Sequence, residues 1–378
     1  MAQQHLDPPT DPTARPTSGD ALAGYLRAQA TEFLRSLRQH RDNGAGGNPP
    51  AHGGPATRAK PRVGAQSRLG ESGTVDSGDA ALALRRSARR ISGTLHTFRP
   101  LLDADWSETM RPELAWLSGT LAREHAYAAR LERLLLALHR LSGSSAFPAQ
   151  PGGAAEPVGT GPRTQPAAAE RGSLTVGAAK AGALLERQLT LARTRAHSAA
   201  LGALGSSRFH AVADSVAVLA SEVPLAPASA AADLRPLAAA AEERLCDAVT
   251  ALPLLTAGHP YNAEALIHGL SPDPAPHPQD GPWHQVRLLL RLHRYAREVL
   301  YGEDAAVDVR LLAAGQALNR HRDASEAAAA AAAAARTPRI APATAYALGV
   351  LHADQRHEVE AARFAFQQAW QKQAVGTP

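Results

Sequence analysis

Apolar residues recur along this chain at intervals of three and four positions, the spacing of one face of an α-helix. Between residues 19 and 40, for example, this spacing is carried by Leu22, Leu26, Phe33 and Leu37. The strict alternation of apolar and polar residues that indicates a half-buried strand is found in no segment. The spacing predicts helices over Gly19–His40, Asp79–Asp103, Asp105–Leu141, Leu174–Leu204, Arg208–Glu222, Ala230–Leu255, Pro282–Tyr301, Glu303–Arg336 and Pro342–Lys372.

Stretches dense in Gly, Pro and Ser interrupt the predicted helices at residues 41–79, 142–173 and 271–281. Such segments bury little apolar surface, so they cannot offset the conformational entropy that ordering costs. We therefore expect them to be linkers between helices. Short connections between the remaining helices predict an all-α, antiparallel helical bundle.

The linkers also suggest how the chain is organised. A first helical repeat covers residues 19–141 and contains the predicted disordered insertion at 41–79. Helices at 174–372 complete the bundle and contain a second repeat. Residues 1–18 are predicted to form a disordered tail, and residues 373–378 form a second tail.

Composition supports helices over strands. Aromatic residues make up only 4% of the chain, whereas the AVILMFWYC set reaches 44%, so Ala, Leu and Val supply most apolar side chains. The one cysteine, Cys246, cannot form an internal disulfide, which fits a reducing cytoplasm. The longest apolar run, Ala327–Ala335, is too short to span a bilayer, so we expect no membrane association.

The net charge is +5, and the positive charge comes almost entirely from arginine. Lysine occurs only at Lys60, Lys180 and Lys372. A GC-rich genome explains such a composition without any function. Arginine is also the side chain whose planar fork binds phosphate oxygens in pairs, so the positions of the arginines decide between the two explanations.

One stripe of basic residues lies on the predicted helix at 79–103. Arg85, Arg89 and His96 fall on one helical face with Ser92, and Arg90 flanks them. The sequence has no acid between Asp79 and Asp103 to balance these charges locally. Like charges along a helix repel one another, and an anion bound among them would relieve that repulsion.

A second stripe occupies the helix predicted at 282–301, where His284, Arg287, Arg291 and Arg294 are spaced three, four and three residues apart. A single stripe of this kind is ordinarily a solvated face. Two stripes in the two halves of one chain favour a polyanion ligand instead. By analogy with nucleic acids, its affinity should fall steeply as salt increases.

Both stripes resemble the two signatures of the conserved histidine α-helical (CHAD) domain family. Tyr295 extends the second signature, and LNRHRD from Leu318 resembles a turn of the family that includes His321 and Asp323. The first signature is matched at Arg85, Arg89, Arg90, Leu95, Phe98, Arg99, Pro100, Leu101 and Leu102.

The resemblance implies a two-repeat helical bundle around a central basic groove, with inorganic polyphosphate as the ligand and cytoplasmic polyphosphate granules as the associated compartment. On this interpretation the ligand contacts are Arg85, Arg89, Arg90, His96, His284, Arg287, Arg291, Arg294 and His321.

The sequence departs from the family pattern where several basic residues are expected. Leu82, Ser92, Leu288 and Leu292 occupy such places. The predicted helix that contains Glu242, Glu243 and Asp247 is acidic where relatives are basic. Electrostatic attraction is a sum over many charges, so these departures support an alternative: a CHAD scaffold or interaction module that has lost its polyphosphate site.

Other functions have weaker support. The sequence contains no phosphate-binding glycine loop, nucleophile motif or helical metal-site spacing, so we expect no catalysis, cofactor or metal. Nucleic acid ranks below polyphosphate because the stripes lack interleaved aromatic residues for base stacking. The alanine-rich segment at 326–335 is a candidate contact for a protein partner, although high helix propensity explains it equally well.

Overall fold

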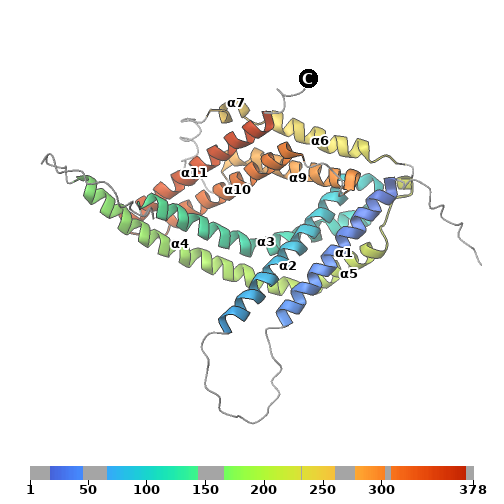
Figure 1. Cartoon of the computed structure of the whole chain (residues 1–378), viewed down its shortest axis with the longest axis horizontal. Coiled ribbons are helices and arrows are strands. Elements are labelled where there is room, and N and C mark those ends of the chain that lie inside the picture. The colour runs from blue at the N-terminus through green and yellow to red at the C-terminus, as the bar shows by residue number, and fades with distance from the viewer. Residues whose placement is uncertain are drawn as a thin grey trace, which may run out of the picture. The chain divides into compact units, whose positions relative to one another are not determined.

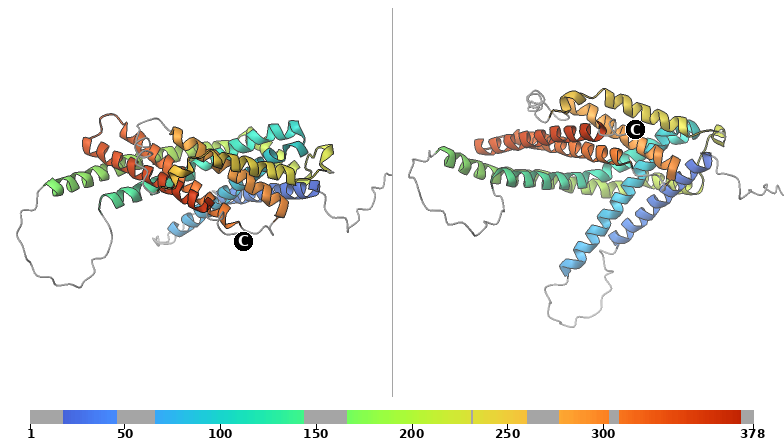
Figure 2. Two further views of the ribbon diagram at one scale, coloured as in Figure 1. Left: turned by 90° about the horizontal axis from the view of Figure 1, so that it is seen from above. Right: turned by 45° about the horizontal axis from the view of Figure 1, so that its top comes forward.

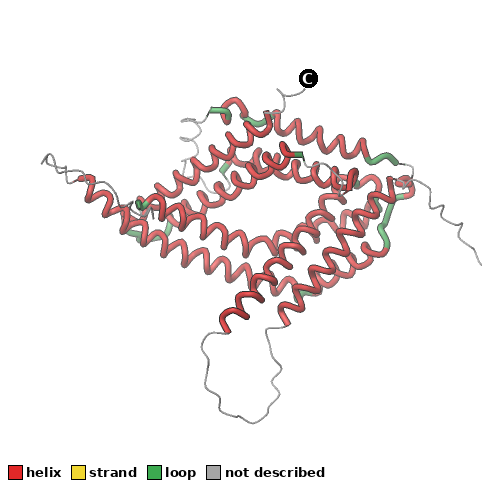
Figure 3. The backbone as a smooth tube through the Cα atoms, viewed as in Figure 1, coloured by secondary structure: helices red, strands yellow, loops and turns green. Residues whose placement is uncertain are grey.

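A computed structural model describes residues 18–45, 66–143, 166–230, 232–259, 277–302 and 308–371 of the chain. Figure 3 shows that the regular structure in these ranges is helical, which confirms the all-α prediction. The α-helices, labelled in Figure 1, are α1 (Ser18–Ala45), α2 (Gln66–Thr97), α3 (Ala104–Leu141), α4 (Pro166–Leu204), α5 (Ser207–Ser221), α6 (Arg235–Thr250), α7 (Leu254–Ala257), α9 (Gly281–Tyr301), α10 (Val309–Ala335) and α11 (Pro342–Gln371).

Two of the predicted linkers are shorter than the sequence indicated. Helix α2 begins at Gln66 and α4 begins at Pro166, inside the segments assigned to 41–79 and 142–173. Proline suits the first position of a helix, and extending an existing helix costs far less than nucleating one. Helix α1 also extends into the first of these segments, to Ala45. Residues 46–65, 144–165 and 271–276 lie outside the described residues, as do most of both tails.

Two other predicted helices have different limits in the structure. The segment predicted at 230–255 contains α6 and, after Pro253, the single turn α7. Helix α10 begins at Val309 because the Asp308 carboxylate accepts a hydrogen bond from the Leu311 backbone N–H at 3.0 Å. That carboxylate satisfies one of the donors that every helix start leaves unpaired.

The helices form two compact units, each built from three segments of chain. Unit 1 contains residues 1–121, 203–242 and 292–305, and unit 2 contains residues 122–202, 243–291 and 306–378. The boundaries fall inside α3, α4, α6 and α9, so each of these helices contributes to both units. The division of the chain into two sequence repeats follows different limits and stays a prediction.

Unit 1 is organised around α1 and α2, which lie side by side in Figures 1 and 2. Gly93 of α2 allows a close approach to α9, because a Cβ at this position would lie only 2.6 Å from the Tyr295 ring. The apolar faces predicted from the helical spacing are buried here at Leu22, Leu26, Phe33, Leu84, Ile91 and Leu95.

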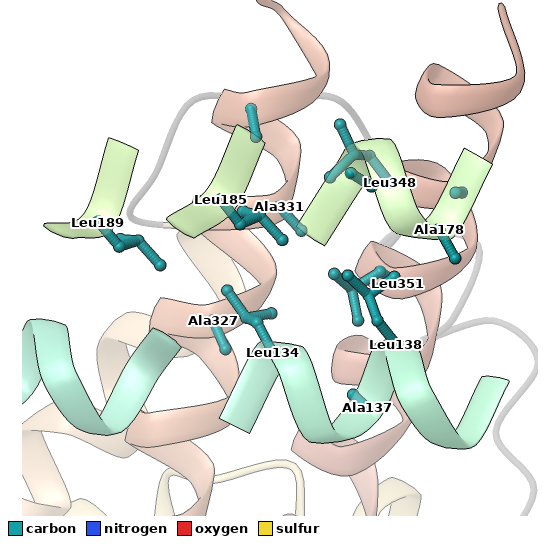
Figure 4. Packing of buried hydrophobic residues seen from close by; sticks show 13 residues of the cluster. Leu134, Ala137, Leu138, Ala178, Leu185, Leu189, Ala327, Ala331, Leu348 and Leu351 are labelled. Atoms are coloured by element: carbon teal, nitrogen blue, oxygen red, sulfur yellow. The ribbon is translucent and has the colours of Figure 1, made fainter. Parts of the chain in front are cut away.

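Unit 2 is organised around α10 and α11, which pack along each other. Figure 4 shows Leu134 of α3, Leu185 of α4, Ala331 of α10 and Leu351 of α11 meeting in one apolar cluster. The alanine-rich segment therefore lies in the core of this unit, with Ala334 also fully buried. Small side chains allow the close helix packing, which explains the alanines without a protein partner.

The helices described in the structure include none that is long and apolar enough to cross a membrane.

Candidate anion-binding site

The basic residues of α9 contribute to one group of charges in each unit. The first, in unit 1, is named here the unit 1 cluster and consists of Tyr25, Arg90, Arg294, Tyr295 and Glu298. The second is named the unit 2 cluster and consists of His284, Arg287, Arg291, Asn319, Arg322, Asp323 and Glu326.

In the unit 1 cluster, the arginines surround an acid. The Glu298 carboxylate accepts hydrogen bonds from the Tyr25 hydroxyl and from Arg90 Nε, each at 2.8 Å. Arg90 Nη2 lies 3.4 Å from the second carboxylate oxygen, to which Arg294 Nε also approaches at 3.4 Å. Both guanidinium groups lie over the ring of Tyr295, at 6.0 and 5.5 Å from its centroid.

The pKa values in this cluster reflect the paired charges. Burial acts to lower the pKa of Arg90, but the hydrogen bond and negative charge of Glu298 raise it above its ordinary value. Burial raises the pKa of Tyr25, and Glu298 raises it further. The positive charge of Arg90 is thus already balanced by an acid within the chain.

The unit 2 cluster has a different arrangement around Arg287. Its Nε donates a hydrogen bond at 2.8 Å to the amide oxygen of Asn319, which carries no charge. Burial and the like charges of Arg291 and Arg322 lower the pKa of Arg287 to about 9, although Asp323 and Glu326 act in the opposite direction. Cations from α9 and α10 therefore repel one another around this side chain.

The acids of the unit 2 cluster hold other arginines in place. Asp323 accepts a hydrogen bond from Arg322 Nε at 2.9 Å, and Glu326 lies 3.8 Å from the same nitrogen. Glu326 also accepts a hydrogen bond from Arg130 of α3 at 2.5 Å. These two acids therefore hold Arg322 in place.

A buried ionic group lies at the start of α9 in the same unit. Asp280 accepts hydrogen bonds at 2.7 Å from Arg356 Nη1 and Arg363 Nη2, both in α11. Burial acts to raise the pKa of Asp280, but contacts with His321 and Arg356 bring it well below its ordinary value. The ionised Asp280, which directly precedes Gly281, thus ties the segment before α9 to α11.

His321 links this buried group to the unit 2 cluster. Its side chain is only 1% exposed, and its ring stacks on Trp283 and meets the edge of His284, with centroids 5.6 and 5.5 Å apart. Burial lowers the pKa of His321 to about 4, so the ring is neutral at neutral pH. His284 is half-buried, and burial also lowers its pKa.

The predicted contact residues are thus distributed over both units. His284, Arg287 and Arg291 come together in unit 2, and His321 lies buried behind His284. Arg90 and Arg294 come together in unit 1 around Glu298. On α2 in unit 1, Arg85 and Arg89 are half-buried, and His96 is exposed.

Several residues of these clusters were missed by sequence reasoning. Glu298 lies four residues after Arg294, a spacing that pairs opposite charges on a helix, so this partner could have been found. Arg322 and Asn319 lie in the turn motif that begins at Leu318, but only the fold brings them to Arg287. Leu292, an unexpected apolar residue in the basic signature, is buried in unit 1.

The all-α fold and the two arginine clusters agree with what comparison with known protein families finds. The CHAD domain model matches residues 65–331, and the chain belongs to this family. Among solved structures it is similar to PptA from Streptomyces chartreusis, with 66% identity and a TM-score of 0.71 over 95% of this chain and 100% of that one. No curated protein matches the chain.

Proposed function

We propose that this protein binds inorganic polyphosphate at the unit 2 cluster and has no catalytic role in its turnover. The supporting observation is the convergence of Arg287 and Arg291 from α9 with Arg322 from α10. Arg287 donates to a neutral amide, and the like charges of Arg291 and Arg322 outweigh the opposing effect of Asp323 and Glu326, an arrangement that a phosphate chain would stabilise. Membership of the CHAD family supports the same ligand.

The chemistry of the cluster suits linked phosphates. Each phosphate unit offers oxygens that a guanidinium fork binds in pairs, and a chain of units neutralises several arginines at once. The half-buried position of Arg287 lowers the local dielectric and strengthens each contact. The neutral His284 ring can donate one further hydrogen bond.

Not every predicted residue has the same role in this proposal. The buried His321 ring supports His284 from behind and does not contact the polymer. Three residues of α2 remain predicted contacts, namely Arg85, Arg89 and His96. The groove shared by the two repeats also remains a prediction. The unit 2 cluster alone supplies the primary site.

Titration with inorganic polyphosphate tests this proposal. We expect binding at about 50 mM salt that weakens at least tenfold at about 200 mM salt, because bound phosphates release counterions. Arg287→Met should weaken low-salt binding by about tenfold, the loss of one charge-assisted contact. Arg35→Met is a matched control, since Arg35 is an exposed α1 residue paired with Glu32, and it removes the same charge.

The alternative is a CHAD scaffold without a polyphosphate site. The pairing of Arg90 and Arg294 with Glu298, and the burial of Leu292 within the second signature, favour this alternative. It predicts no binding at low salt, or equal weakening by Arg287→Met and Arg35→Met. Competition with RNA would identify a general polyanion binder, because RNA and polyphosphate would then displace each other from the protein.

A further inference from the structure

The Glu298 carboxylate lies in a complete anion-binding arrangement. Arg90 approaches both of its oxygens, Arg294 approaches one, and the Tyr25 hydroxyl donates to the other. These donors come from α1, α2 and α9, so only the folded unit 1 assembles them. Two guanidinium groups and a phenol around two oxygens also match the donors that a phosphate would need.

From this geometry we infer that Glu298 is a resident anion that occupies a second phosphate site and withholds Arg90 and Arg294 from polyphosphate. The inference rests on the proposed function, since it concerns which arginines of the family signature contact the polymer. It makes Glu298 a residue that limits how many phosphates the protein engages. The unit 2 cluster is then the primary polyphosphate site.

The strength of this occupation follows from its being intramolecular. A carboxylate attached to the same fold competes at a high effective concentration, and free phosphate must displace it. Arg90 and Glu298 side chains are each 24% exposed, so their attraction is stronger than that of a fully solvated pair. A solution polyanion therefore has little to gain from displacing Glu298.

Replacing the carboxylate with an amide of the same shape should open the site. In Glu298→Gln, two guanidinium groups lose their counter-charge while the packing around Tyr295 is kept. We expect polyphosphate to bind about tenfold more tightly at low salt than it binds the wild type. We also expect the slope of log affinity against log salt to become steeper by about one to two, the number of cations released.

The test compares titrations of inorganic polyphosphate into the wild type, Glu298→Gln and Arg90→Met at several salt concentrations. Arg90→Met should change low-salt affinity by less than about twofold, because Arg90 does not contact the polymer. Unchanged affinity and slope in Glu298→Gln would overturn the inference. A loss in Arg90→Met as large as that in Arg287→Met would overturn it as well.

Circular dichroism and thermal unfolding establish whether each variant is folded. If Glu298→Gln is unfolded, the Arg90→Met result alone decides, since it tests the same assignment. Binding by Glu298→Gln but not by the wild type would support the occupied site and refute the proposed function. If the wild type binds, Arg287→Met loses binding and Glu298→Gln binds as the wild type does, the proposed function is supported and the occupied site is refuted. Absence of binding in all proteins would refute both.

Discussion

The unit 1 and unit 2 clusters contain arginines from the same signature helix, yet the pKa values of Arg90 and Arg287 shift in opposite directions. Glu298 raises the pKa of Arg90, whereas burial and neighbouring arginines lower that of Arg287 to about 9. In the first group, Arg90 and Arg294 share the single Glu298 carboxylate within the chain. The second group would be stabilised by an anion from solution.

This difference shows why a stripe of arginines is an incomplete indicator of a binding site. Helical spacing places Arg287 and Arg294 on one face of α9, but their partners come from elsewhere. Asn319 of α10 supplies a neutral acceptor for Arg287, and Glu298 supplies a negative charge for Arg294. The partner, and not the arginine, decides whether the position is available to a ligand.

The largest expected effect concerns the buried ionic group that supports the unit 2 cluster. Asp280→Ala leaves Arg356 and Arg363 buried without their shared acid, and we expect a loss of about 3–5 kcal/mol in unfolding free energy. Chemical denaturation measures it. Glu298→Gln, at a half-buried position in unit 1, should cost clearly less. A loss of under about 1 kcal/mol in Asp280→Ala would contradict the role given to that carboxylate.

A second effect is the pH dependence of unfolding free energy that His321 gives to unit 2. The pKa of His321 is lowered to about 4 in the fold and returns to about 6.5 on unfolding, so the unfolded state takes up the proton first as pH falls. The stability that neutral His321 contributes is present above about pH 6.5 and decreases by up to about 3 kcal/mol towards pH 4.

The groups facing this ring are Asp280, Arg363 and His284, and the pKa of His284 is lowered as well. Denaturation at a series of pH values, compared with His321→Gln, isolates the contribution of His321. The variant should show a shallower decline over this range. Parallel profiles for the two proteins would show that His321 does not titrate in this way.

A smaller effect concerns the packing behind the unit 1 cluster. Gly93→Ala places a Cβ 2.6 Å from the Tyr295 ring, on which Arg90 and Arg294 lie, and should lower unfolding free energy by about 1–3 kcal/mol. Polyphosphate affinity should stay within about twofold of wild type. Gly119→Ala in α3 is the matched control.

Outside the chain neighbours of Gly119 and the backbone of its own helix, no atom lies within 4 Å of a Cβ at this position, so that substitution should be neutral or stabilising by up to about 1 kcal/mol through helix propensity. Equal effects of the two glycine substitutions on thermal unfolding would refute the close packing of α2 on Tyr295.

Sequence alone predicted the helices well because their apolar faces repeat locally. Leu22, Leu26 and Phe33 carry the apolar face predicted for the first helix, and all three are buried. Helices α2 and α4 begin earlier than the apolar spacing predicts, since glycine and serine weaken a helix without excluding it.

The site was less predictable, because its decisive contacts join residues distant in sequence. Tyr25 and Glu298 are 273 positions apart, and Arg90 and Glu298 are 208 apart. Spacing identified Arg90 and Arg287 as equal candidates. Only the folded arrangement separates a paired arginine from one repelled by its neighbours.

The most direct test of this separation is an NMR titration of the folded protein with inorganic polyphosphate, following the Nε–Hε resonances of labelled arginines. The resonances of Arg287 and Arg322 should shift with increasing polyphosphate, while that of Arg90 should stay in place. A shift of Arg90 with Arg287 unchanged would contradict it.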